Sequence, residues 1–138
     1  MKADSWIDQA NTEKALKLLR RIDNGDTLTA DEMNELATIQ ILNFSKQGIV
    51  ELPESIGILS QLTDLDISDN ELISLPESIG NLSRLIYLDI SGNKLINLPE
   101  RIDNLSRLIY LDISGNKLVN LSESIGNLSQ LRYLDIFR

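Results

Sequence analysis

The sequence predicts an α/β solenoid, with a short curved parallel sheet on the concave side, 3₁₀ or short helical segments on the convex side, and a helical cap at the N-terminus. Three observations carry this prediction. The stretch RLIYLDISGNK occurs at residues 84–94 and again, unchanged, at 107–117. The same apolar pattern recurs every 23 residues from residue 39 onward. Residues 1–38 carry no repeat and have helical periodicity instead.

The repeat divides residues 39–138 into four full units and the start of a fifth. In each unit the alternation in LDI predicts a short strand whose Leu and Ile face inward. The Asn that follows is expected to hydrogen-bond backbone groups of a tight turn, which Gly92 or Gly115 permits. LPESIGNL then predicts a helical or 3₁₀ segment on the opposite side. The units are 39–61, 62–84, 85–107 and 108–130, with residues 131–138 as the partial fifth.

The repeated segments resemble a known family. LTDLDISDNEL at 62–72 and LIYLDISGNKL at 85–95 and 108–118 are similar to the leucine-rich repeat pattern LxxLxLxxNxL. The continuation LPESIGNLSRL resembles the 23-residue intracellular class of Ras-suppressor-like and many bacterial repeat proteins. The resemblance implies a solenoid that mainly serves protein interaction. Three residues depart from the pattern, and they predict looser ends and a local change of turn: Gln47 for Asn, Asp103 for Gly, and Ser122 for Pro.

The first helix is predicted from a start and a stop signal. Ser5, with Asp8 three residues later, is a candidate N-terminal cap, and Asn24-Gly25 ends the helix. Because the end of a solenoid needs a cover, we expect this helix to pack on the first unit. Trp6 is then expected in the core rather than at a binding site.

A second, shorter helix is predicted after residue 28. Thr29 followed by Glu32 forms a capping box. The apolar residues that this helix is expected to present are Met33, Leu36 and Ala37.

Composition excludes several classes of function. The chain has 13 basic and 21 acidic residues, so its net charge of −8 argues against nucleic acid or an anionic membrane and favours a basic partner. It has no Cys and no His, so no thiolate metal site and no His-dependent nucleophile is available. We therefore predict neither an enzyme nor a cofactor. Hydrolysis by carboxylates alone, through Asp89 and Asp112, is the enzymatic alternative, but these residues stand side by side rather than across a cleft.

Strand parity predicts which side chains the sheet displays. The third position of successive units gives Tyr87, Tyr110 and Tyr133, and the fifth gives Asp66, Asp89, Asp112 and Asp135. Tyrosine supplies rigid contact area, and neighbouring carboxylates suit Arg or Lys of a partner. The predicted partner-binding residues are these seven together with Ile86 and Ile109. The alternative is that an exposed sheet needs polar residues for solubility. A flat row of carboxylates does not enclose an ion, so no metal site is predicted.

The C-terminal stretch RYLDIFR predicts an open strand edge. The chain stops one strand into a new unit, and an unpaired edge invites pairing with another chain. We predict a homodimer about a two-fold axis, with the last strand as a terminal cap being the alternative. The predicted interface residues are Leu131, Leu134, Ile136 and Phe137. The alternative function is accordingly a self-assembling structural unit.

The sequence also bears on location. The start, MKADSWIDQ, lacks the apolar core of a signal peptide, and no stretch approaches the roughly 20 apolar residues of a membrane span. We predict a cytoplasmic protein, with export as an effector left open. The Asn-x-Ser triplets at Asn43, Asn81, Asn104 and Asn127 fall in phase with the repeat, so we interpret them as structural.

Overall fold

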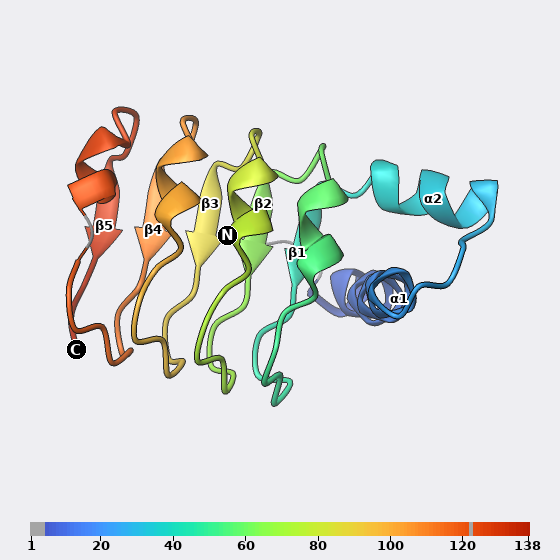
Figure 1. Ribbon diagram of the computed structural model, residues 1–138, viewed down its shortest axis with the longest axis horizontal. Coiled ribbons are helices and arrows are strands. Elements are labelled where there is room, and N and C mark those ends of the chain that lie inside the picture. The colour runs from blue at the N-terminus through green and yellow to red at the C-terminus, as the bar shows by residue number, and fades with distance from the viewer. Residues whose placement is uncertain (1–4, 122) are drawn as a thin grey trace.

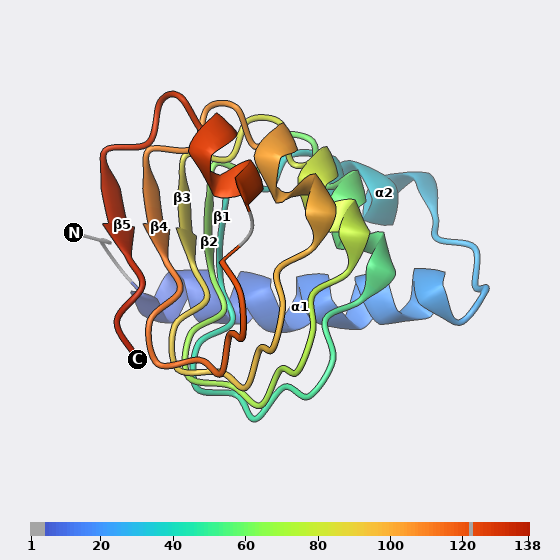
Figure 2. The ribbon, with the colours of Figure 1, turned by 60° about the vertical axis from the view of Figure 1, so that its left-hand side comes forward.

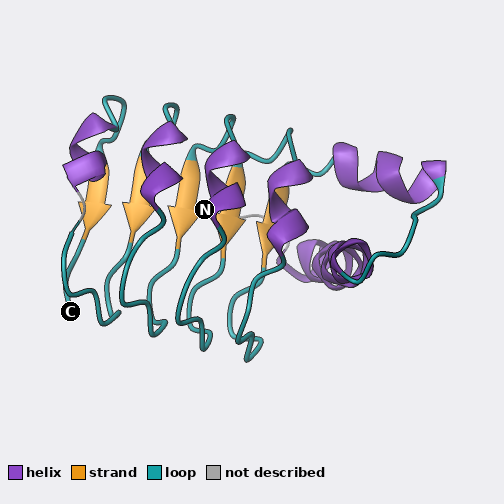
Figure 3. Cartoon of the chain, in the orientation of Figure 1, coloured by secondary structure: helices purple, strands orange, loops and turns teal. Residues whose placement is uncertain are grey.

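The computed structural model describes residues 5–121 and 123–138, with the side chains of residues 5–11 and 124 outside that description. Two α-helices, α1 (Ser5–Asp23) and α2 (Ala30–Ala37), precede an alternation of strands and 3₁₀ helices (Figures 1 and 3). The strands are β1 (Ile41–Asn43), β2 (Asp64–Asp66), β3 (Tyr87–Asp89), β4 (Tyr110–Asp112) and β5 (Tyr133–Asp135). The 3₁₀ helices are η1 (Glu54–Ile58), η2 (Glu77–Asn81), η3 (Glu100–Asn104) and η4 (Glu123–Asn127).

The strands form one parallel sheet in the order β1-β2-β3-β4-β5. Each strand starts 23 residues after the previous one, and equivalent residues are paired, as Tyr87 is with Tyr110. Figure 2 shows the sheet on one side of the molecule and the 3₁₀ helices on the other. The inward Leu88 and Ile90 are fully buried between these two layers. The predicted α/β solenoid is therefore confirmed.

The Asn of each turn ties its unit to the preceding one. Asn93 accepts a hydrogen bond from the backbone N–H of Leu72 (3.1 Å) and donates to the carbonyls of Ile67, Ile90 and Ser91 (3.0–3.2 Å). Asn70 and Asn116 make equivalent bonds. These contacts confirm the expected role of the Asn.

The residue before each Asn has the left-handed backbone that the sequence predicted. Gly92 and Gly115 have φ of +66° and +65°, and Asp69, at the same position of the second unit, has φ of +56°. Asp tolerates this conformation better than most residues do.

The departure at Asp103 does not change the turn, so that expectation was wrong. η3 has the same length as η2, and the residue that follows it, Leu105 (φ −79°, ψ 61°), has nearly the same backbone angles as Leu82 after η2 (φ −80°, ψ 65°). This position needs no positive φ, because Gly80, at the equivalent position of η2, is not among the residues with positive φ. The Asp103 carboxylate accepts a bond from Asn127 Nδ2 (3.4 Å). Ser122 lies outside the described residues.

At Gln47 the fold lacks a preceding unit to which an Asn would bind. The Gln47 backbone N–H instead donates to Oδ1 of Asn70 (3.0 Å) in the following unit. Its side-chain Nε2 is buried and has no hydrogen-bond partner among the described residues. Among the described residues, the turn of the first unit therefore leaves a buried hydrogen-bond donor unpaired, unlike the turns that contain Asn.

Helix α1 covers the first unit across both layers. Thr12 Oγ1 accepts a bond from the backbone N–H of Asn43 in β1 (3.2 Å). At the other end of α1, the Asp23 carboxylate accepts bonds from the N–H groups of Glu54 and Ser55 (2.8 and 3.0 Å), at the start of η1. Gly25, with φ of +88°, follows the end of the helix as predicted. The N-terminal helical cap is thus confirmed, whereas the predicted roles of the Ser5, Asp8 and Trp6 side chains lie outside the described residues.

Helix α2 begins with the predicted capping box. Thr29 Oγ1 accepts a bond from the N–H of Glu32 (3.1 Å), and the Glu32 carboxylate accepts one from the N–H of Thr29 (2.9 Å). Only Leu36 of the three expected apolar residues is buried, while Met33 and Ala37 are exposed. A helix of eight residues presents a single narrow stripe to the core, which explains the difference. Within the described residues, no helix is both long and apolar enough to cross a bilayer.

Candidate functional site

Three tyrosines stack in a row across the concave sheet. The strand register pairs Tyr87 with Tyr110 and Tyr110 with Tyr133. In both pairs the ring centroids are 4.3 Å apart, with 12° and 3° between the ring planes. Tyr87 and Tyr110 are half-buried and Tyr133 is exposed. Sequence parity placed these residues together, but it did not predict that the rings stack face to face.

The stack changes the chemistry of its middle member. Tyr110 has a ring against each of its faces, and burial, the main cause, together with the negative charges of Asp112 and Asp89, raises the pKa of its phenol well above 10.0. The hydroxyl therefore stays protonated above the pH at which an exposed tyrosine ionises, and it can donate a hydrogen bond.

The aspartates form a second row at the next outward position, paired in register as Asp66, Asp89, Asp112 and Asp135. Asp66 is buried, so the prediction that it is displayed to a partner was wrong, whereas the other three are half-buried. In the middle units, Oδ1 of each Asp accepts two bonds from the Ser two residues later. In Asp112 these come from the Ser114 N–H (3.0 Å) and hydroxyl (2.6 Å). The same pair of bonds occurs at Asp66 and Asp89. Asn43 makes both bonds with Ser45 in the first unit, so the position needs an Asx oxygen rather than a charge.

This turn was missed at the level of sequence, although its signal, an Asx followed by Ser two residues later, recurs in four units. It gives the row a structural role. Hydrogen bonds to Oδ1 offset the repulsion between carboxylates about 4.8 Å apart, which costs roughly 1 kcal/mol per pair in water-like screening.

The negative charge of Asp89, near the centre of the row, is nevertheless energetically unfavourable. Burial is the main cause that raises the pKa of Asp89, and the charges of Asp66 and Asp112 act in the same direction against the bonds from Ser91. A cation brought by a partner would relieve this repulsion. Among the described residues, no group of three or more acidic side chains is arranged to hold a metal ion.

The two rows are bordered by apolar side chains. Ile86 and Ile109, which directly precede Tyr87 and Tyr110, are both exposed. Ile41, at the tyrosine position of β1, is exposed as well, and Asp64 follows it in β2. The candidate face therefore runs from an apolar and acidic end at β1–β2 to an aromatic and acidic end at β3–β5.

The predicted interface residues lie at the β5 end of the sheet. Leu134, Ile136 and Phe137 are exposed, Phe137 to 79%, whereas Leu131 is half-buried against the core. Backbone bonds to β4 and the turn after it continue as far as Phe137, whose carbonyl accepts from the N–H of Gly115 (2.7 Å). Three of the four predicted residues thus form an apolar surface at this end.

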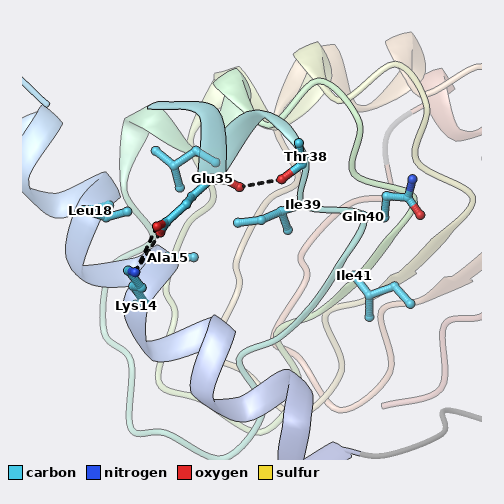
Figure 4. A pocket seen from close by; sticks show the side chains of 9 residues that line it. Lys14, Ala15, Leu18, Glu35, Thr38, Ile39, Gln40 and Ile41 are labelled. Atoms are coloured by element: carbon cyan, nitrogen blue, oxygen red, sulfur yellow. Dashed lines mark hydrogen bonds and ion pairs between the residues drawn. The ribbon is translucent and has the colours of Figure 1, made fainter. Parts of the chain in front are cut away.

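A separate hollow of about 500 Å³ lies at the opposite end, where α1, α2 and the start of β1 meet (Figure 4). Lys14 Nζ and the Glu35 carboxylate (2.8 Å) form an ion pair beside it, and Thr38 Oγ1 donates to the Glu35 carbonyl (3.1 Å). Ala15 and Leu18 give it an apolar wall. The concave face, which carries a row of tyrosines beside a row of aspartates, is the stronger candidate for binding a charged partner.

The comparisons with known proteins agree with this architecture. A family model described as "Leucine-rich repeat region" matches residues 13–138. Among curated proteins, none matches the chain. A leucine-rich repeat protein of Leptospira interrogans is 28% identical with a TM-score of 0.59, over 80% of this chain and 34% of that one. The plant peptide hormone receptor RGFR1, solved in complex with RGF2, is 34% identical with a TM-score of 0.68, over 76% of this chain and 18% of that one.

The leucine-rich repeat domain of APL1B is 21% identical with a TM-score of 0.67, over 80% of this chain and 36% of that one, and supports the fold alone. The chain spans between 18% and 36% of the length of these three chains. The 23-residue intracellular class stays a prediction. With the repeated strands, the Asn of each turn and the match over residues 13–138, the chain belongs to the leucine-rich repeat family.

Proposed function

We propose that the chain is a non-catalytic binding module that holds a basic segment of a partner protein on its concave face. The observation that carries this proposal is the pair of parallel rows, with stacked tyrosines beside carboxylates on one face of the sheet. The net charge of −8 favours a basic partner over an acidic one.

The family supports the general part of the proposal. Leucine-rich repeat regions are in general protein-interaction modules and are typically non-catalytic. Of the similar structures, RGFR1 is a peptide hormone receptor solved in complex with RGF2. A peptide or an extended segment is therefore a reasonable form for the partner of this chain.

The geometry of the two rows supports one way in which such a segment would be held. Because Tyr110 has a ring on each face, a partner meets its edge and hydroxyl rather than its π face. A partner Arg or Lys instead pairs with Asp89 and Asp112, whose Oδ1 atoms are fixed by the serines. Pairing with Asp89 lowers the raised pKa of that carboxyl, so binding strengthens as the pH rises through it.

Selection from a displayed library of random peptides tests the proposal. We expect the selected peptides to contain more Arg and Lys than the starting library. They should bind at least tenfold more weakly to the triple variant Tyr87→Ala, Tyr110→Ala, Asp112→Asn, in which the amide keeps the turn as Asn43 does.

The matched control is Ile58→Ala with Glu100→Gln, which removes apolar area and one charge from exposed positions of the 3₁₀ layer. This control should bind the selected peptides as the wild type does. Selection of neutral or acidic peptides, or unchanged binding to the triple variant, would refute the concave-face proposal.

A second candidate function is self-association through β5, which the exposed Leu134, Ile136 and Phe137 favour. An apolar strand edge of this kind pairs readily with another strand. Ile136→Glu should then convert a dimer to a monomer while peptide binding survives. If Ile136→Glu had the same mass as the wild type at every concentration, self-association through β5 would be refuted.

A further inference from the structure

Four exposed aliphatic side chains occupy equivalent positions in the loops that follow the strands. They are Val50, Ile73, Ile96 and Val119, and they are 67%, 62%, 47% and 67% exposed. These loops form the lower edge of the solenoid in Figure 1, between the sheet and the 3₁₀ helices. We call these four residues the aliphatic ladder. They lie outside the concave face and outside the β5 strand.

The backbone holds the ladder as one continuous strip. The loops are hydrogen-bonded to each other beside it, from the N–H of Lys94 to the carbonyl of Leu72 (2.8 Å) and from that of Lys117 to Leu95 (2.9 Å). The N–H of Val119 donates directly to the carbonyl of Ile96 (3.1 Å). Neighbouring rungs are therefore close to the strand spacing of about 4.8 Å.

The fold itself does not require apolar side chains at these positions. Each rung follows a core residue of its own loop, such as Leu72 before Ile73, and points to solvent. A polar residue such as Thr would suit the same extended backbone. Single exposed apolar residues are ordinary on a protein surface, but a contiguous strip of them marks a contact surface.

Three charged residues lie beside the ladder, two residues before its second, third and fourth members. They are Glu71, Lys94 and Lys117, with the uncharged Gly48 at the first position, and Lys94 Nζ lies 2.6 Å from the Glu71 carboxylate. The order of the ladder, Val-Ile-Ile-Val, is the same from either end. A two-fold axis between Ile73 and Ile96 would therefore set Ile73 against Ile96 of the second copy, and Val50 against Val119 of the second copy.

The charges select this register over its neighbours. In it, Glu71 faces Lys94 of the second copy, and Lys94 faces Glu71 of the second copy, so that opposite charges meet on both sides of the axis. A shift of the axis by half a unit in one direction sets Glu71 against Glu71 of the second copy. A shift in the other direction sets Lys94 against Lys94 of the second copy. Both shifts are penalised by like-charge contact.

We propose that the aliphatic ladder is the contact surface between two copies of this chain, which pair side by side and antiparallel about this axis. The strip is smaller than a standard interface of about 800 Å² per partner, so the dimer dissociates on dilution through the micromolar range. Both concave faces stay open, which gives the pair two binding sites.

Sedimentation equilibrium of the full chain tests the pairing. The wild type should change from 15.5 kDa to twice that mass as its concentration rises through the micromolar range. Ile73→Glu should remain at 15.5 kDa at every concentration. The control Ile58→Glu, which changes an exposed Ile on η1 away from the ladder, should dimerise as the wild type does. Circular dichroism checks that both variants are folded.

Cysteine cross-linking tests the register, because the chain has no Cys of its own. Ile73→Cys and Ile96→Cys are prepared separately, mixed and oxidised gently. The mixed disulfide dimer should form several-fold faster than the dimer of either variant alone. Equal rates in the mixture and in the separate samples would overturn the antiparallel register.

The remaining outcomes are also decisive. A monomeric wild type at high concentration, or a dimer that survives Ile73→Glu, overturns the ladder interface. A dimer lost in Ile136→Glu but kept in Ile73→Glu assigns the contact to β5 and likewise overturns it. Ile73→Glu should still bind the selected basic peptides, so failure of the ladder and failure of the concave face are distinguishable.

Discussion

The ring of Tyr110 lies parallel to the ring of Tyr133, with 3° between their planes and 4.3 Å between their centroids. Tyr87 covers the other face of Tyr110 at the same distance. The stack therefore excludes water from the central ring, and burial raises the pKa of its phenol.

Tyr110→Phe should consequently remove a tyrosine that ionises above pH 10.0. Because the folded pKa is the higher one, the stability linked to this phenol is fully present below pH 10.0 and is lost as the pH rises toward the folded pKa. The free energy of unfolding of Tyr110→Phe should thus depend less steeply on pH in this range than that of the wild type. Urea unfolding on both sides of pH 10 measures the difference, and parallel pH profiles would contradict it.

Asp89→Asn should keep the strand-ending turn and stabilise the fold at neutral pH. Burial raises the Asp89 pKa above 3.8, so the folded state favours the protonated carboxyl. The stability linked to this group is fully present below pH 3.8 and is lost as the pH rises through the folded pKa. At pH 7 the ionised carboxylate is thus unfavourable, and the neutral amide should gain about 0.5 kcal/mol after allowance for solvent screening.

Thermal unfolding at pH 7 and at pH 3 measures the effect of Asp89→Asn, which should be larger at pH 7. Glu100→Gln, on an exposed part of η3, is the control and should show little change at either pH. A destabilised Asp89→Asn would mean that the charge, rather than the Asx oxygen, holds the turn.

Asn93→Ala should destabilise the chain by about 3 kcal/mol. The substitution leaves the N–H of Leu72 and three carbonyls without their buried partner. Gln47→Leu is the contrasting variant, because the Gln47 amide nitrogen is buried without a partner among the described residues. It should be neutral or stabilising by about 1 kcal/mol. Chemical denaturation of both variants checks the prediction, and equal losses would contradict it.

Gly80→Ala should destabilise the contact between η2 and η3 by about 2 kcal/mol. A Cβ at Gly80 would lie 2.6 Å from the backbone oxygen of Arg101, so the two units must move apart. Gly126→Ala is the matched control at the equivalent position of η4, where a Cβ meets nothing within 4 Å. It should gain a few tenths of a kcal/mol from its better helix propensity. Similar melting temperatures for the two variants would show that the units separate freely.

Much of the candidate site could be predicted from the sequence, because the repeat fixes strand parity. Once Leu88 and Ile90 are placed in the core, Tyr87 and Asp89 must face outward, and the 23-residue period aligns them with Tyr110 and Asp112. Turn chemistry predicted the role of the Asn in each turn, and the segment LPESIGNL predicted the 3₁₀ layer.

The remaining features depend on side-chain geometry that the pattern does not contain. The stacking of Tyr110 requires rotamers that all three rings share, and the double bond from Ser114 to Asp112 requires the bent backbone after the strand. The change of turn expected at Asp103 was wrong, because the sequence pattern does not show that the backbone at this position is the same with Asp as with Gly. The aliphatic ladder was overlooked because exposed Ile and Val do not belong to the repeat signature.

The hydrogen bonds of the Asn in each turn also favour folding in one direction along the chain. Asn70 locks the loop of the unit before it, and Asn93 and Asn116 do the same one and two units later. During synthesis on the ribosome, each new unit would therefore pack on a unit that has already folded. Its Asn would then complete the hydrogen bonds of the preceding loop. The chain is accordingly suited to fold progressively as it is synthesised, starting from α1, rather than to wait for its last residue.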